Sequence, residues 1–433
     1  MNDMIIRNGT VIDGATAKEV DVLVIDGKIS AVGSNLKTDH LPLTTENLEI
    51  INAKGLTVCP GLVDMHVHLR EPGQEGKETV ATGTRAAAKG GVTSLACMPN
   101  TVPALDNPAI LAYLMMKVAK DAVVRVYPVG CISAERKGEM LADIPALKES
   151  GIVGISDDGN CVMNALLARR AMMYAQSLGL AYIEHAEDPN LADNGVMNEG
   201  LVALKLGLSG ISPVAEEVVV ARDILLAQTT GVKLHITHIS TIPTLALIKN
   251  AKKRGVKVTC DVTPHHLVLT DEAVEGYNTN AKVNPPLRDE ATRKALVAGV
   301  LDGTIDAIAS DHAPHGINEK DVDFGSAAFG LIGLETILGL SIKVLGEAGM
   351  ALPEIIRKLT TGPAGILNIP GGTLCVGANA DIAIFDPNGE WTVEAGALAS
   401  KSKNTPFLGW KLPGKVLHTI VGGKIIVKEG AVI

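Results

Sequence analysis

The feature that most constrains this chain is a regular alternation of short apolar runs with longer helical patterns through its middle. Helical patterns cover residues 78–90, 108–120, 163–178, 214–229 and 242–254. The apolar runs number eight and cover residues 56–69, 91–99, 123–130, 151–158, 180–186, 232–240, 256–264 and 304–314. Eight such units predict an α/β protein, a (β/α)8 barrel of the TIM type, with its chemistry at the carboxyl ends of the strands.

The two ends of the chain have a different rhythm. Residues 1–55 contain short β-type runs separated by Asn-Gly and Asp-Gly turns, as β-hairpins require. The last stretch, with runs such as DIAIFD and KVLHTIV, behaves in the same way. We therefore predict one small β-domain formed by residues 1–55 and 368–433 together, and a hydrolase barrel over residues 56–367.

Charge and composition exclude several kinds of partner. The net charge is −9 and there is no Lys/Arg-rich run, so nucleic acid is not expected. No apolar stretch reaches ~18 residues without a charge or a breaker, and the start of the chain lacks a signal pattern, so no membrane association is expected. The six cysteines have no paired spacing and suggest reduced thiols. We expect a cytoplasmic enzyme with a small-molecule substrate.

Polar residues of one chemical type follow the apolar runs. His66 and His68 end the first run, and because residues two apart on a strand share a face, both can bind one metal ion. Further candidates end the fourth, fifth, sixth and eighth runs: Asp158, His185, His238 and Asp311. An isolated His-x-His is a weak signal, but this set at one barrel mouth indicates a site for Zn²⁺ or a similar cation. Two metal ions would require one carboxylate between them.

The chain also carries a specific series of motifs. They are HVHLREPGQEGKET (66–79), CMPNT (97–101), SDDG (156–159), EHAED (184–188), THIS (237–240), TPHHL (263–267), NPPLR (284–288) and SDHAPH (310–315). Their order along essentially the whole chain resembles the amidohydrolase superfamily, and within it the long-chain bacterial (class I) dihydroorotases. That resemblance implies the reversible cyclisation of N-carbamoyl-L-aspartate to L-dihydroorotate with loss of water, the third step of pyrimidine (UMP) biosynthesis.

The resemblance also implies a role for individual residues. It assigns His66, His68 and Asp311 to one zinc ion, with Asp311 as the catalytic proton carrier. It assigns the second zinc ion to His185 and His238, with Asp158 between the two ions. It assigns substrate contacts to His68, Arg70, Asn100, Asn284, His315, Phe329 and Gly330. For Arg70 there is a physical reason as well, because a planar guanidinium is a natural bidentate partner for a carboxylate.

The side-by-side pair Asp157 and Asp158 raises a separate question. Neighbouring residues on a strand point to opposite faces, so the two carboxylates are not both expected in the barrel mouth. The family pattern selects Asp158 as the metal ligand. Asp157 is then expected to face away, as a hydrogen-bond acceptor for the following turn.

Two departures from the family pattern affect the expected site. Many relatives have a carboxylated lysine where this chain has the shorter Asp158, so one zinc ion is conceivable although two are expected. Relatives also commonly have a proline directly before the Phe329-Gly330 pair, where this chain has Ala328. We interpret His265, His266 and His312 as supporting or structural residues.

The sequence leaves alternatives open. Hydantoinase and allantoinase are related cyclic-amide hydrolases, but they usually carry the lysine. A non-catalytic scaffold for aspartate transcarbamoylase tends to lose metal ligands, which this chain retains. A structural metal barrel without turnover does not explain Asp311 beside Arg70. The family also suggests a homodimer and a possible association with aspartate transcarbamoylase.

Overall fold

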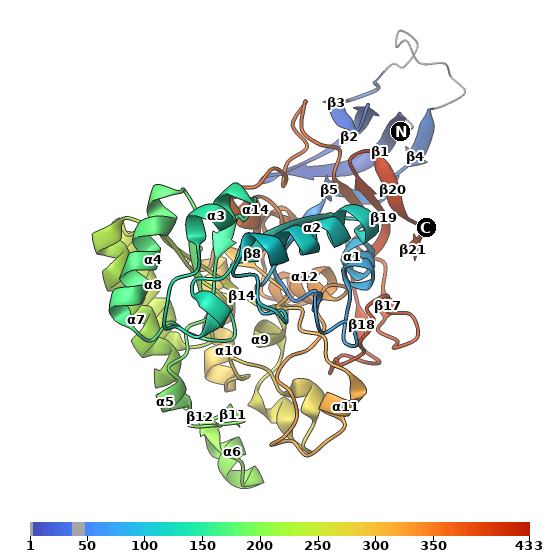
Figure 1. The fold of residues 1–433 in the computed structure, drawn as a ribbon. Helices are drawn as coiled ribbons and strands as arrows, with labels where there is room; N and C mark the ends of the chain where they lie inside the picture. The colour runs from blue at the N-terminus through green and yellow to red at the C-terminus, as the bar shows by residue number, and fades with distance from the viewer. Residues whose placement is uncertain (1–2, 37–47) are drawn as a thin grey trace.

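The computed structural model describes residues 3–36 and 48–433, and it contains the predicted barrel (Figure 1). An eight-stranded parallel sheet runs in the order β15-β14-β13-β10-β9-β8-β7-β6. These strands are β6 (Leu62–Val67), β7 (Val92–Cys97), β8 (Arg125–Gly130), β9 (Gly154–Ile155), β10 (Ala181–Glu184), β13 (Lys233–Ile236), β14 (Val258–Val262) and β15 (Ala307–Ile308). The sheet nearly closes, because Val67 forms a parallel bridge with His312, and the backbone N–H of His68 donates to the His312 carbonyl at 2.9 Å.

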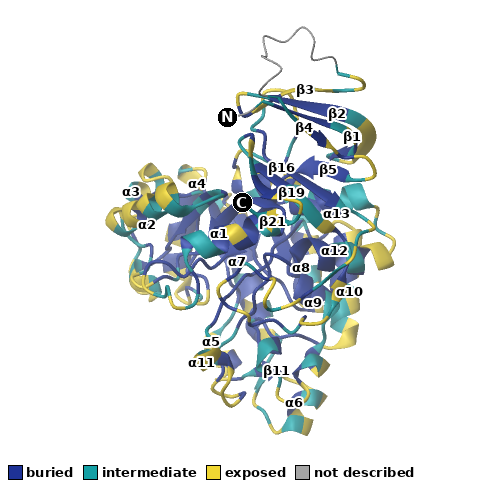
Figure 2. Ribbon diagram, turned by 90° about the vertical axis from the view of Figure 1, so that its right-hand side faces the viewer, coloured by how far each residue is buried: buried dark blue, intermediate teal, exposed yellow. Residues whose placement is uncertain are grey.

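Helices surround the barrel between its strands. All five predicted helical patterns are confirmed, as α1 (Val80–Lys89), α2 (Pro108–Asp121), α4 (Ala165–Ser177), α7 (Val214–Thr230) and α8 (Ile242–Lys253). Side chains of Thr79, Asn107, Asn164 and Thr241 cap four of them by accepting from backbone N–H groups of the first turn. The remaining barrel helices are α3 (Ile144–Glu149), α10 (Glu290–Leu301), α12 (Ile337–Glu347), α13 (Leu352–Leu359) and α14 (Thr361–Leu367). Figure 2 shows the buried barrel interior and the exposed outer faces of α2, α3 and α4.

The two ends of the chain form a second sheet together. Its nine strands are β1 (Met4–Asp13), β2 (Thr16–Ile25), β3 (Lys28–Gly33), β4 (Glu49–Asn52), β5 (Thr57–Pro60), β16 (Ile382–Asp386), β19 (Lys415–Val421), β20 (Lys424–Lys428) and β21 (Ala431–Val432). β5 lies between β1 and β16, so it joins the N-terminal strands to the C-terminal ones. Both termini lie at this end of the molecule (Figure 1). A small sheet built from the termini is therefore confirmed.

The first apolar run differs from the prediction. Residues 56–69 were expected to form one strand, but the run divides at Gly61 into β5 of the terminal sheet and β6 of the barrel. Both parts are fully buried, and the residues next to Gly61 on either side are apolar, so no polar residue marks the division. A Cβ atom at Gly61 would lie 2.0 Å from Thr93 Oγ1, so only glycine allows the chain to pass Thr93 here.

Two irregular segments complete the barrel mouth. An arm between β10 and α7 contains α5 (Pro189–Ala192), β11 (Met197–Asn198), α6 (Leu201–Leu206) and β12 (Gly210–Ile211), and it projects at the bottom of Figure 1. The segment between β17 (Trp391–Thr392) and β18 (Lys411–Leu412) packs against the mouth through Phe407, which is fully buried. None of the described helices is long and apolar enough to cross a membrane.

Candidate metal centre and substrate cavity

The His66-x-His68 pair lies at the end of β6, and both rings face Asp158. His66 Nε2 lies 3.2 Å from Asp158 Oδ1, and His68 Nε2 lies 3.6 Å from Asp158 Oδ2. Asp311, which follows β15, places Oδ1 3.1 Å from His68 Nε2 and 3.5 Å from His66 Nε2. All four side chains are buried. Residues from the first, fourth and eighth strand positions therefore meet at one point.

A second group of ligand-type atoms shares the same aspartate. His185 Nδ1, after β10, lies 3.8 Å from Asp158 Oδ1, and His238 Nε2, after β13, lies 3.7 Å from it. The two groups capable of holding a metal ion are thus His66, His68 and Asp158 on one side and Asp158, His185 and His238 on the other. Asp158 stands between them.

These atoms fit a divalent cation. His66 Nε2 and Asp158 Oδ1 are buried, and within residues 3–36 and 48–433 neither has a hydrogen-bond partner although they lie 3.2 Å apart. Buried polar atoms are normally hydrogen-bonded, and such an exception needs an explanation. Imidazole nitrogens with carboxylate oxygens are the donor set that zinc and similar cations prefer. A metal ion would satisfy these atoms, and the residues present therefore fit one.

The charges of the group are strongly coupled. Burial opposes a charge on His66, but Asp158 and Asp311 outweigh burial and raise the pKa of His66 to about 10. Burial and the neighbouring His238 lower the pKa of His185 to about 3. Burial opposes ionisation of Asp311 and Asp158, yet the surrounding histidines hold the pKa of both carboxyls below the usual range. Both carboxylates are therefore ionised near neutral pH.

The histidines are oriented by residues that the sequence analysis did not identify. His66 Nδ1 lies 2.8 Å from Thr237 Oγ1, and that hydroxyl donates to Asp261 Oδ2 at 3.1 Å. Asp261 Oδ1 also accepts from the backbone N–H of His238 at 2.6 Å. A buried aspartate in the middle of the apolar run VKVTCDVTP was the only available signal. Such contacts fix ring orientation and raise metal affinity.

The two adjacent aspartates do diverge, but Asp157 has other partners than expected. Its Oδ1 accepts from the backbone N–H groups of Ile132 and Ser133 at 2.9 and 3.0 Å, and its Oδ2 from the Ser133 hydroxyl. These residues follow β8, so Asp157 braces the preceding loop and not the following turn. The prediction failed because β9 ends at Ile155, and the loop is free to turn Asp157 toward the neighbouring strand.

Arg70, Asn100 and His315 lie on one side of the metal-type residues. Arg70 Nε donates to the Pro314 carbonyl at 3.1 Å, and its Nη2 lies 3.2 Å from His315 Nε2. Asn100 Oδ1 lies 2.8 Å from His68 Nδ1. Within the described parts of the chain, the buried Arg70 guanidinium forms no ion pair with a carboxylate, and burial lowers its pKa to about 10. A buried cation without an internal counter-ion is suited to an anionic ligand.

One cavity of about 240 Å³ brings nearly all the predicted residues together. Only His66 among them does not line it, because His66 lies beneath Asp158 and Asp311. The lining residues are His68, Arg70, Asn100, Asp158, Gly159, His185, His238, Asn284, Asp311, Ala313, His315, Phe329 and Gly330. Gly159 and Ala313 are additions to the predicted set.

The Phe329-Gly330 corner is held by residues far along the chain. Asn404 Nδ2 donates to the carbonyls of Ala313 and Gly330, each at 3.1 Å, and Asn404 Oδ1 accepts from the His315 N–H. Gly330 has φ +124°, and a Cβ there would lie 2.6 Å from that of Ala313, so glycine is required. Asn404 had no recognisable signal in the sequence.

Three of these residues have strained backbone. The backbone φ angles are +62° at Arg70, +38° at His238 and +46° at Asp311, a region that residues other than glycine rarely adopt. Such conformations persist where the surrounding structure holds them in place, and they cluster at functional sites.

The three other motif histidines lie outside the cavity. His312 packs against Glu78, His266 forms hydrogen bonds with Thr263 and Pro285, and His265 is buried beside His266.

Known proteins resemble this chain along its whole length. A family model described as "Dihydro-orotase-like" matches residues 55–243, and one described as "Amidohydrolase family" matches residues 227–427. The dihydroorotase of Geobacter sp. (strain M21) is 50% identical over 430 residues, covering 99% of this chain and 100% of that protein. The dihydroorotase of Citrifermentans bemidjiense is 51% identical over 426 residues, covering 98% and 99%.

Solved structures share the fold at lower identity. L-Hydantoinase (dihydropyrimidinase) from Arthrobacter aurescens has a TM-score of 0.89 at 24% identity, covering 100% of this chain and 98% of that one. The family matches place the chain in the amidohydrolase superfamily, and its convergent His/Asp groups together with the dihydroorotase relatives indicate a hydrolase that acts on cyclic amides. Within that superfamily, the full-length relatives show that this chain belongs to the dihydroorotase family.

Proposed function

We propose that this chain is a dihydroorotase, which interconverts N-carbamoyl-L-aspartate and L-dihydroorotate. The observation that carries the proposal is a single cavity with two chemical halves. One half holds two metal-type groups that share Asp158. The other holds the buried Arg70 guanidinium, which has no carboxylate partner in the described chain. Dihydroorotate is a cyclic amide that carries a free carboxylate, so it presents one suitable group to each half.

In this proposal His66, His68, Asp158, His185, His238 and Asp311 hold zinc. When bound, zinc supplies Lewis-acid chemistry, polarising an amide carbonyl and lowering the pKa of water. The ionised Asp311 accepts the proton of the attacking water in the hydrolytic direction and delivers it to the ring nitrogen that leaves. The same carboxyl group acts in reverse during cyclisation. Asp311 suits this role because it borders both the metal-type residues and the cavity.

Arg70 and Asn100 donate to the free carboxylate of the substrate in the proposed complex, and His315 takes part through the Arg70 guanidinium, which its Nε2 contacts. Asn284 and the backbone of Phe329 and Gly330 contact the rest of the molecule. Fixing the carboxylate at one end of a small cavity places the reacting amide beside Asp311, so the reacting atoms stay close and aligned. His68 faces both halves, since its Nδ1 bonds Asn100 and its Nε2 faces Asp158 and Asp311.

A hydantoinase or allantoinase activity is the alternative, because hydantoinases share the fold. The Arg70 guanidinium, which has no carboxylate partner within the described residues, favours a substrate with a carboxylate over a neutral ring. Rates on dihydroorotate, hydantoin and allantoin measured side by side distinguish these activities. A dihydroorotase-like scaffold for aspartate transcarbamoylase would show no turnover on any of the three.

The number of zinc ions, the assembly and the location of the protein are also part of the proposal. We propose two zinc ions per subunit, with a single ion as the alternative that the short Asp158 side chain allows. A homodimer, an association with aspartate transcarbamoylase and a cytoplasmic location are proposed from the family resemblance. The six cysteines are free, as the reduced state of that compartment requires.

The decisive variant is Asp311→Ala. We expect turnover of dihydroorotate to fall about 10²–10⁴-fold, the usual contribution of a positioned acid or base. Metal analysis of the same sample should show the ion at the His185 and His238 group retained. The matched control is Asp302→Ala, which removes an exposed carboxylate paired with Lys249 and should keep normal activity. Near-normal turnover in Asp311→Ala would refute the proton-carrier role.

A further inference from the structure

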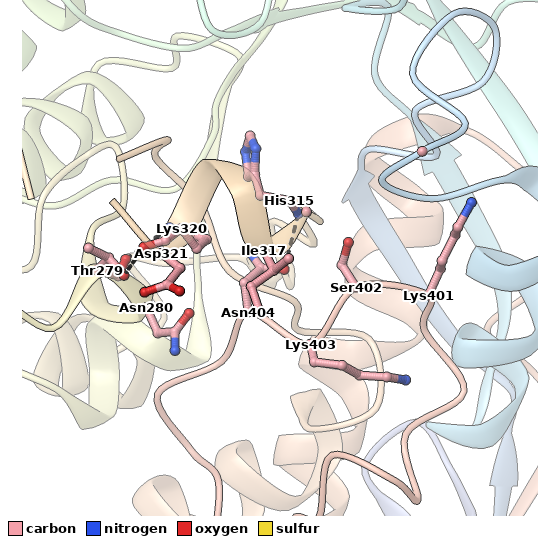
Figure 3. Close-up of a pocket in the computed structure, with 12 residues that line it drawn as sticks. Thr279, Asn280, His315, Ile317, Lys320, Asp321, Lys401, Ser402, Lys403 and Asn404 are labelled. Carbon is pink, nitrogen blue, oxygen red and sulfur yellow. Dashed lines mark hydrogen bonds between the residues drawn. The ribbon is translucent and has the colours of Figure 1, made fainter. Parts of the chain in front are cut away.

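His315 is a buried residue that lines both the substrate cavity and a second cavity of about 550 Å³. Figure 3 shows that second cavity between α11 (Ile317–Lys320) with its neighbours Thr279 and Asn280, and the segment 401–404. Its two ring nitrogens contact Arg70 and Glu319, and these contacts orient the ring between the cavities.

The hydrogen bonds of His315 define which nitrogen carries the proton. Arg70 Nη2 lies 3.2 Å from His315 Nε2, and a guanidinium can only donate, so Nε2 must be the acceptor. Burial and the charge of Arg70 lower the pKa of His315 to about 3, so the ring is neutral and has a single N–H. That N–H must be on Nδ1, which lies 3.3 Å from Glu319 Oε2. The Glu319 carboxylate accepts from it.

Glu319 is itself fixed by two further contacts. Lys77 Nζ lies 2.7 Å from Glu319 Oε1, and the Gly316 N–H donates to Oε2 at 3.1 Å. An ordered series therefore runs from the surface to the cavity: Lys77, Glu319, His315 and Arg70. None of these four is among the proposed metal ligands.

We propose that Glu319 is a positioning residue for carboxylate recognition: by accepting from His315 Nδ1, it selects the tautomer whose Nε2 holds the Arg70 guanidinium in place before the substrate arrives. This inference rests on the proposed function, since it concerns binding of the substrate's carboxylate. A guanidinium held in its binding orientation loses less conformational freedom when the anion binds, which strengthens binding. Glu319 therefore acts on KM through Arg70, without touching substrate or metal.

The test measures steady-state kinetics of dihydroorotate hydrolysis in Glu319→Ala, Glu319→Gln and Arg70→Met, and in the double variant Arg70→Met/Glu319→Ala. Glu319→Ala should raise KM about tenfold, as expected for losing a hydrogen bond to a charged group, and change kcat less. Glu319→Gln should retain most of the affinity, because its amide oxygen still accepts from Nδ1. In the Arg70→Met background, Glu319→Ala should add little. Glu347→Ala, which breaks an exposed ion pair with Lys343, is the matched control.

A spectroscopic readout is independent of turnover. In protein labelled with ¹⁵N-histidine, with the resonance identified by His315→Gln, the wild type should show the Nδ1–H tautomer, and Glu319→Ala should show a mixture. An unchanged tautomer, an unchanged KM, or additive effects with Arg70→Met would each overturn the inference. Failure of the wild type to hydrolyse dihydroorotate would instead overturn the proposed function, while the tautomer measurement would still test Glu319. If Glu319→Ala does not fold, Glu319→Gln is the deciding variant. A tenfold rise of KM in Glu319→Gln would then contradict the hydrogen-bond role.

Discussion

The two halves of the cavity are built in different ways. The metal half consists of side chains at or just beyond the ends of β6, β10, β13 and β15, with Asp158 three residues after β9. The recognition half is braced in part by side chains from other segments and consists of residues outside helices and strands: Arg70, Asn100, Asn284, His315, Phe329 and Gly330. Lys320 Nζ donates to the carbonyls of Thr279, Lys282 and Ala328, at 2.9, 3.3 and 2.6 Å.

The difference separates chemistry from selection. Strand ends are fixed by the hydrogen-bonded barrel, which places the side chains of the metal-type group directly at its mouth. Loops have no such ladder and need buried polar contacts to keep one shape. Substitutions in the metal half should therefore abolish chemistry, whereas those in the recognition half should change substrate affinity and leave the metal in place.

The largest expected effect is that of Asp158→Ala, which removes the carboxylate shared by both groups. Activity should fall by roughly 10³-fold or more, because Lewis-acid chemistry is worth several kcal/mol and each 1.4 kcal/mol is tenfold. Metal analysis should show both ions weakened together. The matched control is Asp157→Asn, one residue away: it should retain metal, with a lower Tm because Asp157 braces Ile132 and Ser133. Loss of only one ion in Asp158→Ala would show that Asp158 is not shared.

An intermediate effect is expected from Asp261→Asn. Asp261 fixes Thr237, and through it His66, and also fixes the backbone of His238. Loss of such an outer contact typically weakens metal binding 10–100-fold. Competition against a chelator measures this affinity, with wild-type protein as reference. If metal affinity is unchanged, the strand ends alone orient the histidines, which would sharpen the contrast between the halves.

The smallest effect should come from Lys320→Met in the recognition half. The variant keeps the apolar stem but loses the Nζ group, which donates to the carbonyl of Ala328 directly before Phe329 and to those of Thr279 and Lys282. We expect KM for dihydroorotate to rise about tenfold, the scale of one lost hydrogen bond to a charged group, with metal content unchanged. Kinetics and metal analysis on one sample test both statements. Metal loss in this variant would break the proposed division between the halves.

The sequence predicted the barrel and most of the metal half for physical reasons. Buried parallel strands produce apolar runs, and the His66-x-His68 spacing requires a shared face whatever surrounds it. The motif series added the residue roles, and the cavity brings together all but one of the residues that it named. Spacing within a single strand or motif is enough for such inferences.

The supporting contacts could not be predicted, because they join residues far apart in sequence. The Asn404 contacts to Ala313 and Gly330 span 91 and 74 residues. Nothing in the sequence distinguishes Lys320 from a solvent-exposed lysine, and lysine is rarely buried. The division at Gly61 was hidden because the residues directly on both sides of it, Cys59 and Pro60 before and Leu62 and Val63 after, are all apolar. Each feature becomes visible only when the partner segment is in place.

The contacts of Asn404 have a consequence for the order in which the protein is made. Synthesis proceeds from the N-terminus, so even the last of the six proposed metal ligands, Asp311, emerges from the ribosome about ninety residues before Asn404. β5, which precedes the first barrel strand, likewise waits for β16 as its second neighbour. A product that stops short of Asn404 would carry every metal ligand without the brace of its recognition loop. The nascent chain thus contains all its proposed metal ligands early. The Asn404 side chain that holds the recognition loop, and with it the selection of the substrate, is added only near the end of translation.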